Sequence, residues 1–317
     1  MVLLPRKQGY LFQNSFIPRV GRLRVGLHSV VSSFNYGGQA VIEGVMMRGP
    51  RSYAVAVRQA DGSIVAEKER TVAYAERNPV FKWPLLRGNF VLFDSLVLGM
   101  KALSKSANLA MEEEEELSWA EMSGSILLAL VLAIVLFIVA PVGAVHLIRH
   151  WVPGILVQNV LEGFIRIAVF LGYLVAISRM KDIERVFMYH GAEHKVIHTY
   201  EHGDDLTVEN ARKYSTLHPR CGTSFLLVVL VISIFIFALL GGGSLFWKIG
   251  SRILVLPAVA GLGYEFIRFS GRWQQHAWGR FLIAPGLWFQ GLTTREPDDE
   301  QLEVAIRALE EVLKDEN

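Results

Sequence analysis

The sequence predicts a mainly α polytopic membrane protein with about four transmembrane helices, a cytoplasmic histidine-bearing helical loop and a small N-terminal antiparallel β-subdomain. Two observations carry this prediction. Hydrophobic residues make up 52% of the 317 positions and charged residues only 20%, which is more apolar than an ordinary soluble protein. The apolar residues are also concentrated in segments long enough to cross a bilayer, which takes about 20 residues.

Four apolar segments differ in length and in charge. The first and third contain no charged residue, whereas the second carries Glu162 and Arg166, four positions apart in the order that favours a helical ion pair. The fourth is shorter and contains Pro257 and Glu265, so we expect it to span the membrane or to re-enter. The segments are residues 122–148, 155–178, 222–246 and 253–269.

The distribution of lysine and arginine orients these segments, because basic residues are kept in cytoplasmic loops and flanks. There are 15 before residue 122, 7 in residues 179–220 and 5 from residue 272 onward, but only 1 in residues 149–154 and 2 in residues 247–252. We therefore expect a multi-pass protein of the plasma membrane with both termini in the cytoplasm. The single cysteine, Cys221, excludes an intramolecular disulfide and fits a reducing compartment.

Shorter patterns predict the elements outside the membrane. Residues 39–47 and 53–72 look like strands, and Asp61-Gly62 in the second is a favoured hairpin turn. Residues 85–103 are apolar but carry three charges, which predicts an amphipathic helix on or in the membrane surface.

The predicted organisation has seven parts. The basic N-terminal segment does not have the form of a signal peptide. We interpret it as a tail, with a transit peptide or a misplaced start codon as alternative interpretations. The acidic run 112–116 is a solvated linker or helix end, and residues 285–292 are a short interfacial piece. The parts are a basic N-terminal tail (1–35), the β-subdomain (36–84), the amphipathic helix and acidic linker (85–121), transmembrane helices 1 and 2 (122–178), the cytoplasmic helical loop (179–221), transmembrane helix 3 with helix 4 or a re-entrant segment (222–271), and an interfacial segment with a C-terminal amphipathic helix (272–317).

Composition and motifs exclude two classes of partner. A net charge of +2 gives no concentrated basic face, so no nucleic-acid partner is expected. The glycines at 241–243 lack a following Lys-Ser/Thr, so they are not a nucleotide-binding loop. The expected partners are the lipid bilayer and a further membrane protein.

The strongest chemical pattern lies in the middle loop. His190, His194, His198 and His202 recur every four residues, which places neighbouring rings side by side on a helix. His190, Glu193 and His194 spell H-x-x-E-H, the arrangement in which two histidines bind zinc and the glutamate acts as general base.

A hydrolytic zinc site needs a third protein ligand and an open position. His218 and Cys221 precede the third apolar segment and are both ligand types for zinc. Glu201 and Glu265 are further candidates, and an ion pair with Arg268 is the structural alternative for Glu265. Two alternatives to the metal site stay open: a polar histidine face at the membrane surface without metal, and a Cys221–His218 nucleophile pair.

At these residues the sequence resembles the YqhQ-like family of bacterial integral membrane proteins, predicted metal-dependent enzymes of undefined function. The resemblance covers residues 36 to 313. Its blocks are Y-G-G-Q-A-V-I-E-G-V-M from Tyr36, Y-H-G-A-E-H-K-V-I from Tyr189, H-P-R-C-G-T-S-F from His218 and P-G-L-W-F-Q-G-L-T-T-R-E-P from Pro285.

The resemblance implies a site at certain residues of this chain. The family pattern falls on His190, Glu193, His194, Glu201, His218 and Cys221, and it leaves His198 and His202 as additions of this sequence. Glu43 also lies in a family block, either completing the site or pairing with Arg48 or Arg51.

The leading hypothesis is a zinc-dependent hydrolase at the cytoplasmic membrane face. A divalent metal, zinc in the first place, is bound by His190, His194, His218 and Cys221, and Glu193 is the catalytic general base. If all four residues bind, the site is closed and structural. The alternative is a non-enzymatic scaffold or accessory factor for membrane-protein insertion, assembly or turnover, and a transporter is a third possibility.

Overall fold

The computed structural model describes residues 36–71, 81, 83–110, 119–272 and 276–314. The basic tail 1–35 and the acidic run 112–116 lie outside the described residues. The elements described below belong to the part of the chain from Tyr36 onward.

A four-stranded antiparallel sheet with the order β1-β2-β3-β4 confirms the predicted β-subdomain. The strands are β1 Gly37–Val41, β2 Gly44–Arg48, β3 Ser52–Arg58 and β4 Ile64–Arg70. Residues 39–47 are therefore a hairpin and not the single strand that the sequence predicted, because Glu43 takes a positive φ of 50° and Val41 pairs with Gly44. The second turn falls at the predicted position, but three residues rather than two lie inside it, because Gln59 N donates to Ser63 O at 2.9 Å. Gly62 has φ 87°, and Ser63 N donates to Asp61 Oδ1 at 2.8 Å.

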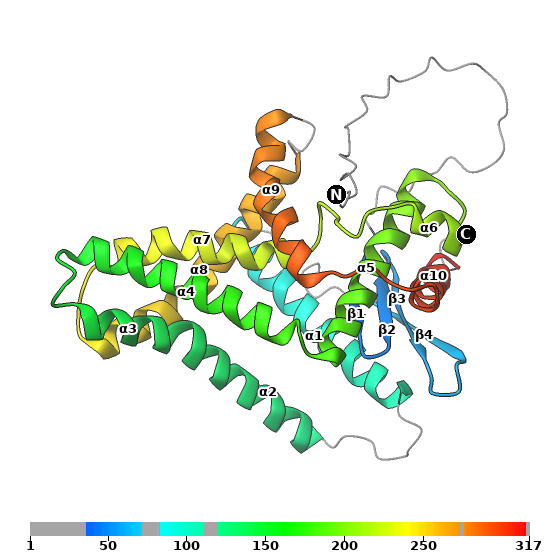
Figure 1. The fold of residues 1–317 in the computed structure, drawn as a ribbon, viewed down its shortest axis with the longest axis horizontal. Helices are drawn as coiled ribbons and strands as arrows, with labels where there is room; N and C mark the ends of the chain where they lie inside the picture. Colours follow the sequence, from blue (N-terminus) through cyan, green and yellow to red (C-terminus); the bar gives the residue numbers. More distant parts are fainter. Residues whose placement is uncertain (1–35, 72–80, 82, 111–118, 273–275, 315–317) are drawn as a thin grey trace, which may run out of the picture. The chain divides into compact units, whose positions relative to one another are not determined.

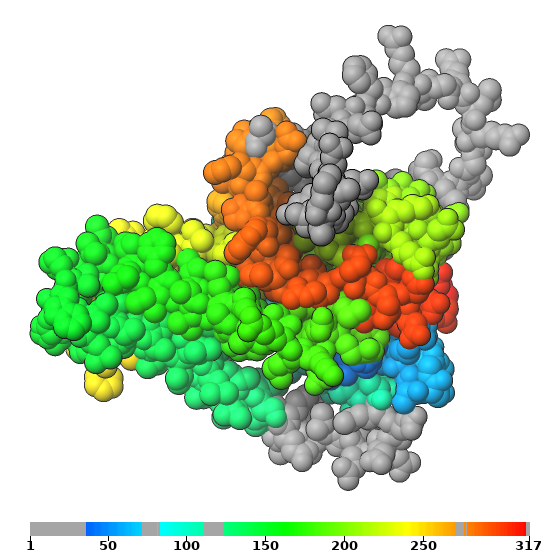
Figure 2. Space-filling model, in the orientation of Figure 1, coloured from blue at the N-terminus to red at the C-terminus, as the bar shows by residue number. Residues whose placement is uncertain are grey.

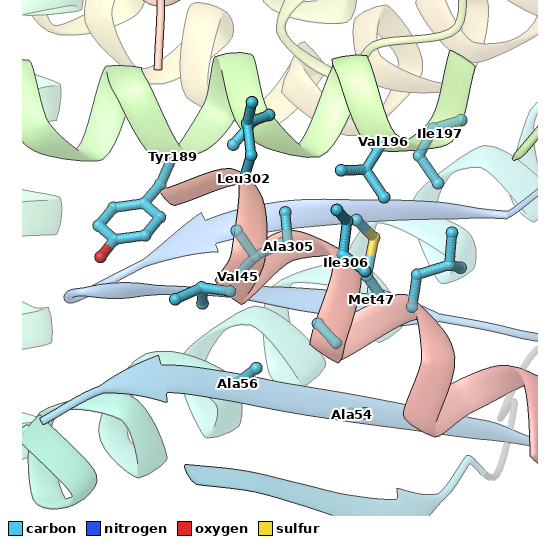
Figure 3. Packing of buried hydrophobic residues seen from close by; sticks show 14 of the residues in the cluster. Val45, Met47, Ala54, Ala56, Tyr189, Val196, Ile197, Leu302, Ala305 and Ile306 are labelled. Carbon is cyan, nitrogen blue, oxygen red and sulfur yellow. The ribbon is translucent and has the colours of Figure 1, made fainter. Parts of the chain in front are cut away.

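Helices cover both faces of this sheet. In β3, Tyr53, Val55 and Val57 point to one face and pack with Ala102 of α1, which spans Leu86–Ala110. Ala54 and Ala56 point to the other face, against α5 (Lys181–His202) and α10 (Asp299–Leu313). Figure 3 shows α5 side chains reaching toward those of α10 and β2 within this core. Helices thus pack on both faces of the sheet, and α5 lies directly against one of them.

The C-terminal helix α10 is amphipathic and packs on the sheet and on α5. Its apolar residues Leu302, Ala305 and Leu309 recur at helical spacing and are buried. Asp298 and Gln301 form a capping box at its start. Figure 2 shows the surface of α10 in contact with that of the neighbouring strands.

Three described helices are long and apolar enough to cross a membrane: Ser123–Ile148, Ile155–Ile177 and Leu245–Ser270. The first is continuous through α2 (Trp119–Ile134), the π-helical turn η3 (Val135–Val139) and α3 (Ala140–Ile148), and the second is α4 (Ile155–Ile177). Figure 1 shows α4, α7 and α8 side by side.

The third predicted span is shorter in the structure than the sequence suggested, and the fourth is longer. The helix α7 (Thr223–Leu239) has 17 residues, because Gly241 takes φ 71° and the chain turns there. The helix α8 (Leu245–Arg272) has 28 residues and continues through Pro257. The structure thus contains, among its described residues, three membrane-length apolar helices and a shorter one rather than four equal spans.

A charged cluster lies buried among these helices. Glu162 Oε1 accepts from Arg166 at 2.7 Å, which confirms the predicted ion pair, and both carboxylate oxygens also accept from Arg252 of α8 at 3.1 Å. Arg166 Nε donates to the Phe137 carbonyl of the π-helical turn at 2.8 Å. A π-helical turn leaves carbonyls outside the regular helical hydrogen-bond pattern, so the hydrogen bond from the Arg166 guanidinium stabilises this turn.

The sequence suggested Arg268 as an ion-pair partner of Glu265, but the partner in the structure is Arg87. The Glu265 carboxylate accepts from Arg87 Nε at 2.6 Å and from a second nitrogen of the same guanidinium. This pair ties the first turn of α1 to α8. Residues 285–292 lie within the helix α9 (Ala277–Thr293), which contacts α7.

Candidate metal centre

The helix α5 aligns its histidines because their spacing of four residues is close to one helical turn. Its first turn carries Asp182 and Glu184, and the helix ends where Gly203 adopts φ 78°. The rings of His190 and His194 have centroids 4.5 Å apart.

His190, His194 and Cys221 form the first donor group. Their ligand atoms all lie within 4.8 Å of one another, and His190 Nε2 is 3.2 Å from Cys221 Sγ. Cys221 directly precedes α7, whose N-cap is Gly222. Two imidazoles from one helix therefore meet a thiol from the start of another.

Backbone carbonyls fix the orientation of both histidines. His190 Nδ1 lies 2.8 Å from Thr293 O, and His194 Nδ1 lies 2.5 Å from Thr216 O. A carbonyl accepts only from a protonated nitrogen, so in each neutral ring Nδ1 is the donor and Nε2 carries the free lone pair. Metal-binding histidines are held in this way, so two imidazole nitrogens and a thiol are positioned as a group that could hold a metal ion.

Glu193 lies beside this group and is 5% exposed. Its Oε2 is 3.4 Å from His194 Nε2. A Cβ at Gly38 of β1 would stand 3.0 Å from Glu193 Cγ and 2.3 Å from Met46 O, so only glycine lets the strand pass this close. The strand β1 thus packs closely against the Glu193 side chain.

His198, Glu201 and His218 form a second donor group. His198 Nε2 lies 3.0 Å from Leu217 O, and His218 Nε2 lies 3.4 Å from Glu201 Oε2. Burial lowers the pKa of both His198 and His218, which favours their neutral form. The other oxygen of Glu201 pairs with Arg220, so much of the carboxylate's charge is already compensated.

The four predicted metal ligands are therefore divided between two groups. His218 is grouped with His198 and Glu201, and its ring centroid is 5.6 Å from that of His194. His198, which the family pattern leaves aside, stands closer to His218, at 4.5 Å between centroids. The first group keeps three donors.

Comparison with known proteins bears on this site. A family model described as "Protein of unknown function (DUF1385)" matches residues 83–315. The chain belongs to the DUF1385 family. It is 37% identical over 293 residues to the protein named "Uncharacterized protein YqhQ" of Bacillus subtilis (strain 168), an alignment that covers 88% of this chain and 92% of that protein. No solved structure matches the chain significantly.

The part of the chain matched by the DUF1385 model contains both donor groups and also a residue that sequence reasoning missed. Gln290 of α9 is fully buried, accepts from His218 N at 2.9 Å and donates to His218 O at 2.9 Å. Its amide also donates to Ser224 Oγ at 3.0 Å. The sequence could have singled out Gln290, because it is a glutamine inside an apolar helix and a buried amide requires hydrogen-bond partners.

Lys195 is a second missed residue. It is 3% exposed, and its ammonium donates to Arg212 O at 3.2 Å and Tyr214 O at 2.8 Å. It also pairs with Glu296 at 2.6 Å. One buried cation therefore joins α5 to the segment before Cys221 and to the segment after α9.

The T-T-R-E block of this DUF1385 chain, residues 293–296, lies directly along α5. Arg295 N donates to Phe187 O at 2.9 Å. A Cβ at Gly191 would stand 2.1 Å from Arg295 O, so the glycine permits this approach. The same contact keeps Thr293 O beside His190.

Two other candidates stand in ion pairs of their own. Glu43 pairs with Arg185 through both carboxylate oxygens, not with Arg48 or Arg51. Glu265 is held by Arg87, as described above.

Proposed function

We propose that this protein is a membrane-embedded, metal-dependent hydrolase in which His190, His194 and Cys221 hold a zinc ion. The observation that carries the proposal is the convergence of these three donors while backbone carbonyls hold the opposite ring nitrogens. Imidazole and thiolate together are donors that zinc prefers.

The number of donors favours a catalytic role over a structural one. Three protein ligands leave a fourth position open, whereas structural zinc sites use four. A zinc ion in such a site acts as a Lewis acid and makes water a nucleophile near neutral pH. The division of the four predicted ligands into two groups supports this open arrangement.

Glu193 is proposed as the general base. Its carboxylate lies next to His194 Nε2, and its side chain packs against β1 and is almost fully buried, which limits its access to bulk water. The hydrogen bond between His218 and Glu201 lies beside the donors and offers a route by which a proton leaves toward the surface.

The distribution of basic residues supports the orientation of the site. It favours a multi-pass arrangement in the plasma membrane with the α5 region and both termini in the cytoplasm. The donors precede α7, an apolar helix, so the site is proposed to lie at the cytoplasmic surface of the bilayer.

Elemental mass spectrometry of detergent-purified protein, never exposed to chelator or metal resin, tests the proposal. We expect about one zinc per chain in the wild type, loss of zinc in His194→Ala and Cys221→Ala, and retention in the exposed control His150→Ala. Glu193→Gln keeps zinc but loses activity in vivo. Wild-type protein without bound metal would instead favour the non-enzymatic scaffold.

A further inference from the structure

A cavity lies between three apolar helices and includes Cys221 of the first donor group among its lining residues. Its volume is about 740 Å³, within the range of sites that hold small ligands. Its walls come from α7, α8 and α9, and Cys221 and Ser224 also line it. A candidate metal ligand thus faces the same space as the membrane helices.

Most of the residues that line the cavity are apolar. Leu227, Val231 and Phe235 recur every four residues along α7 and give one wall, and Phe281 of α9 gives part of another. Phe235 is 67% exposed and Phe281 78% exposed, so the cavity is open to the surroundings of the helices. In a bilayer those surroundings are acyl chains.

The charge in the cavity has one sign. Arg220 and Arg268 line it, and no acidic residue is found among its described lining residues. Arg220 pairs with Glu201, whereas Arg268 has no hydrogen bond or ion pair with any residue that the structure describes. Glu265, one turn before Arg268, interacts with it electrostatically, but its ion pair is with Arg87. The hydrogen-bond donors of Arg268 are therefore not used by a described residue and remain available to an anion.

The chemistry of the walls distinguishes a lipid from a peptide. An extended peptide brings backbone amides that need partners, and the helices cannot supply them because their own backbone groups are paired. An acyl chain needs no such partner. Guanidinium groups bind phosphate well, since their donors match its oxygens.

We propose that this cavity binds one anionic phospholipid, with its acyl chains between α7, α8 and α9 and its phosphate at Arg268 and Arg220, beside Cys221. The assignment of such a lipid as the substrate of the enzyme rests on the proposed function. Binding of the lipid in the cavity is tested separately from that function.

Native mass spectrometry of the full chain in mild detergent measures the binding. Phosphatidylglycerol is titrated against diacylglycerol with the same acyl chains, and zinc content is determined on the same samples. We expect one tightly retained phosphatidylglycerol per chain and weaker retention of diacylglycerol. Arg268→Gln is expected to bind phosphatidylglycerol about fivefold more weakly, the effect of one arginine near an anionic headgroup. The exposed Arg280 lies outside the cavity, so Arg280→Gln is the matched control.

Val231→Trp tests the apolar walls. It is expected to fill the space and to reduce binding of both lipids, whereas Leu226→Trp, on α7 but outside the cavity, leaves binding unchanged. Equal retention of the two lipids, or Arg268→Gln behaving like Arg280→Gln, overturns the proposal. Selective lipid binding in a protein without zinc would overturn the hydrolase but not the lipid site. Bound zinc without selective lipid binding would overturn the lipid site but not the hydrolase.

Discussion

Gly191→Ala tests whether the close approach of two segments maintains the metal site. The new Cβ would stand 2.1 Å from Arg295 O, where ordinary contact begins at 3.4 Å, so the backbone of one segment must move by about 1.3 Å. Overpacking of this kind costs about 1–3 kcal/mol. The gain in helix propensity from glycine to alanine, about 1 kcal/mol, offsets part of it.

The displacement should affect zinc binding more than stability. Thr293 O, two residues before Arg295, accepts from His190 Nδ1, and loss of such an orienting partner lowers metal affinity by about 10–100-fold. The assay is competition for zinc against a chelator of known affinity, alongside thermal unfolding in detergent. Gly172→Ala in α4 is the control, because nothing lies within 4 Å of its Cβ position. Wild-type zinc affinity in Gly191→Ala would refute the reasoning.

Four further predictions follow from the same contacts. Gln290→Ala removes both hydrogen bonds to His218 and is expected to lower the free energy of unfolding by about 1–3 kcal/mol, measured by thermal unfolding, whereas Gln158→Ala in α4 changes it less. Glu162→Gln leaves the buried Arg166 and Arg252 without their counter-charge and is expected to cost about 3–5 kcal/mol; a loss below about 1 kcal/mol would contradict the buried network. Hydrogen bonds from Lys105 and then Tyr53 hold the pKa of Glu69 below its usual value of 4.5. The stability from this lowered pKa is present above pH 4.5 and lost as the pH falls through the folded-state pKa, so the deficit of Lys105→Met at pH 7 should shrink below pH 4.5; a deficit independent of pH would contradict it. Chelator treatment should lower the melting temperature of the wild type but not of Cys221→Ala, since only a protein that binds zinc is stabilised by it.

Local sequence patterns were sufficient where local physics decides. The Asp61-Gly62 turn, the Glu162–Arg166 pair and the histidine-bearing helix each depend on residues a few positions apart. The first two long apolar helices follow from length and composition alone. These features were predicted close to where the structure has them.

The remaining features depend on which distant segments meet. Glu43 pairs with Arg185, 142 positions away, and Glu265 with Arg87, 178 positions away, whereas the ion-pair partners that the sequence suggested for them were near neighbours in the chain. The shortness of α7 depends on the conformation of Gly241, which the apolar run conceals. His198 lies near His218 because the segment before Cys221 folds back along α5, and this grouping could not be derived from the spacing of the histidines.

X-ray absorption at the zinc edge of the purified protein tests the central claim most directly, because it reports which atoms surround the metal. We predict nitrogen donors together with one sulfur at about 2.3 Å in the wild type, and loss of the sulfur in Cys221→Ser. Zinc bound without a sulfur neighbour, or protein without zinc, would contradict the proposed site of His190, His194 and Cys221.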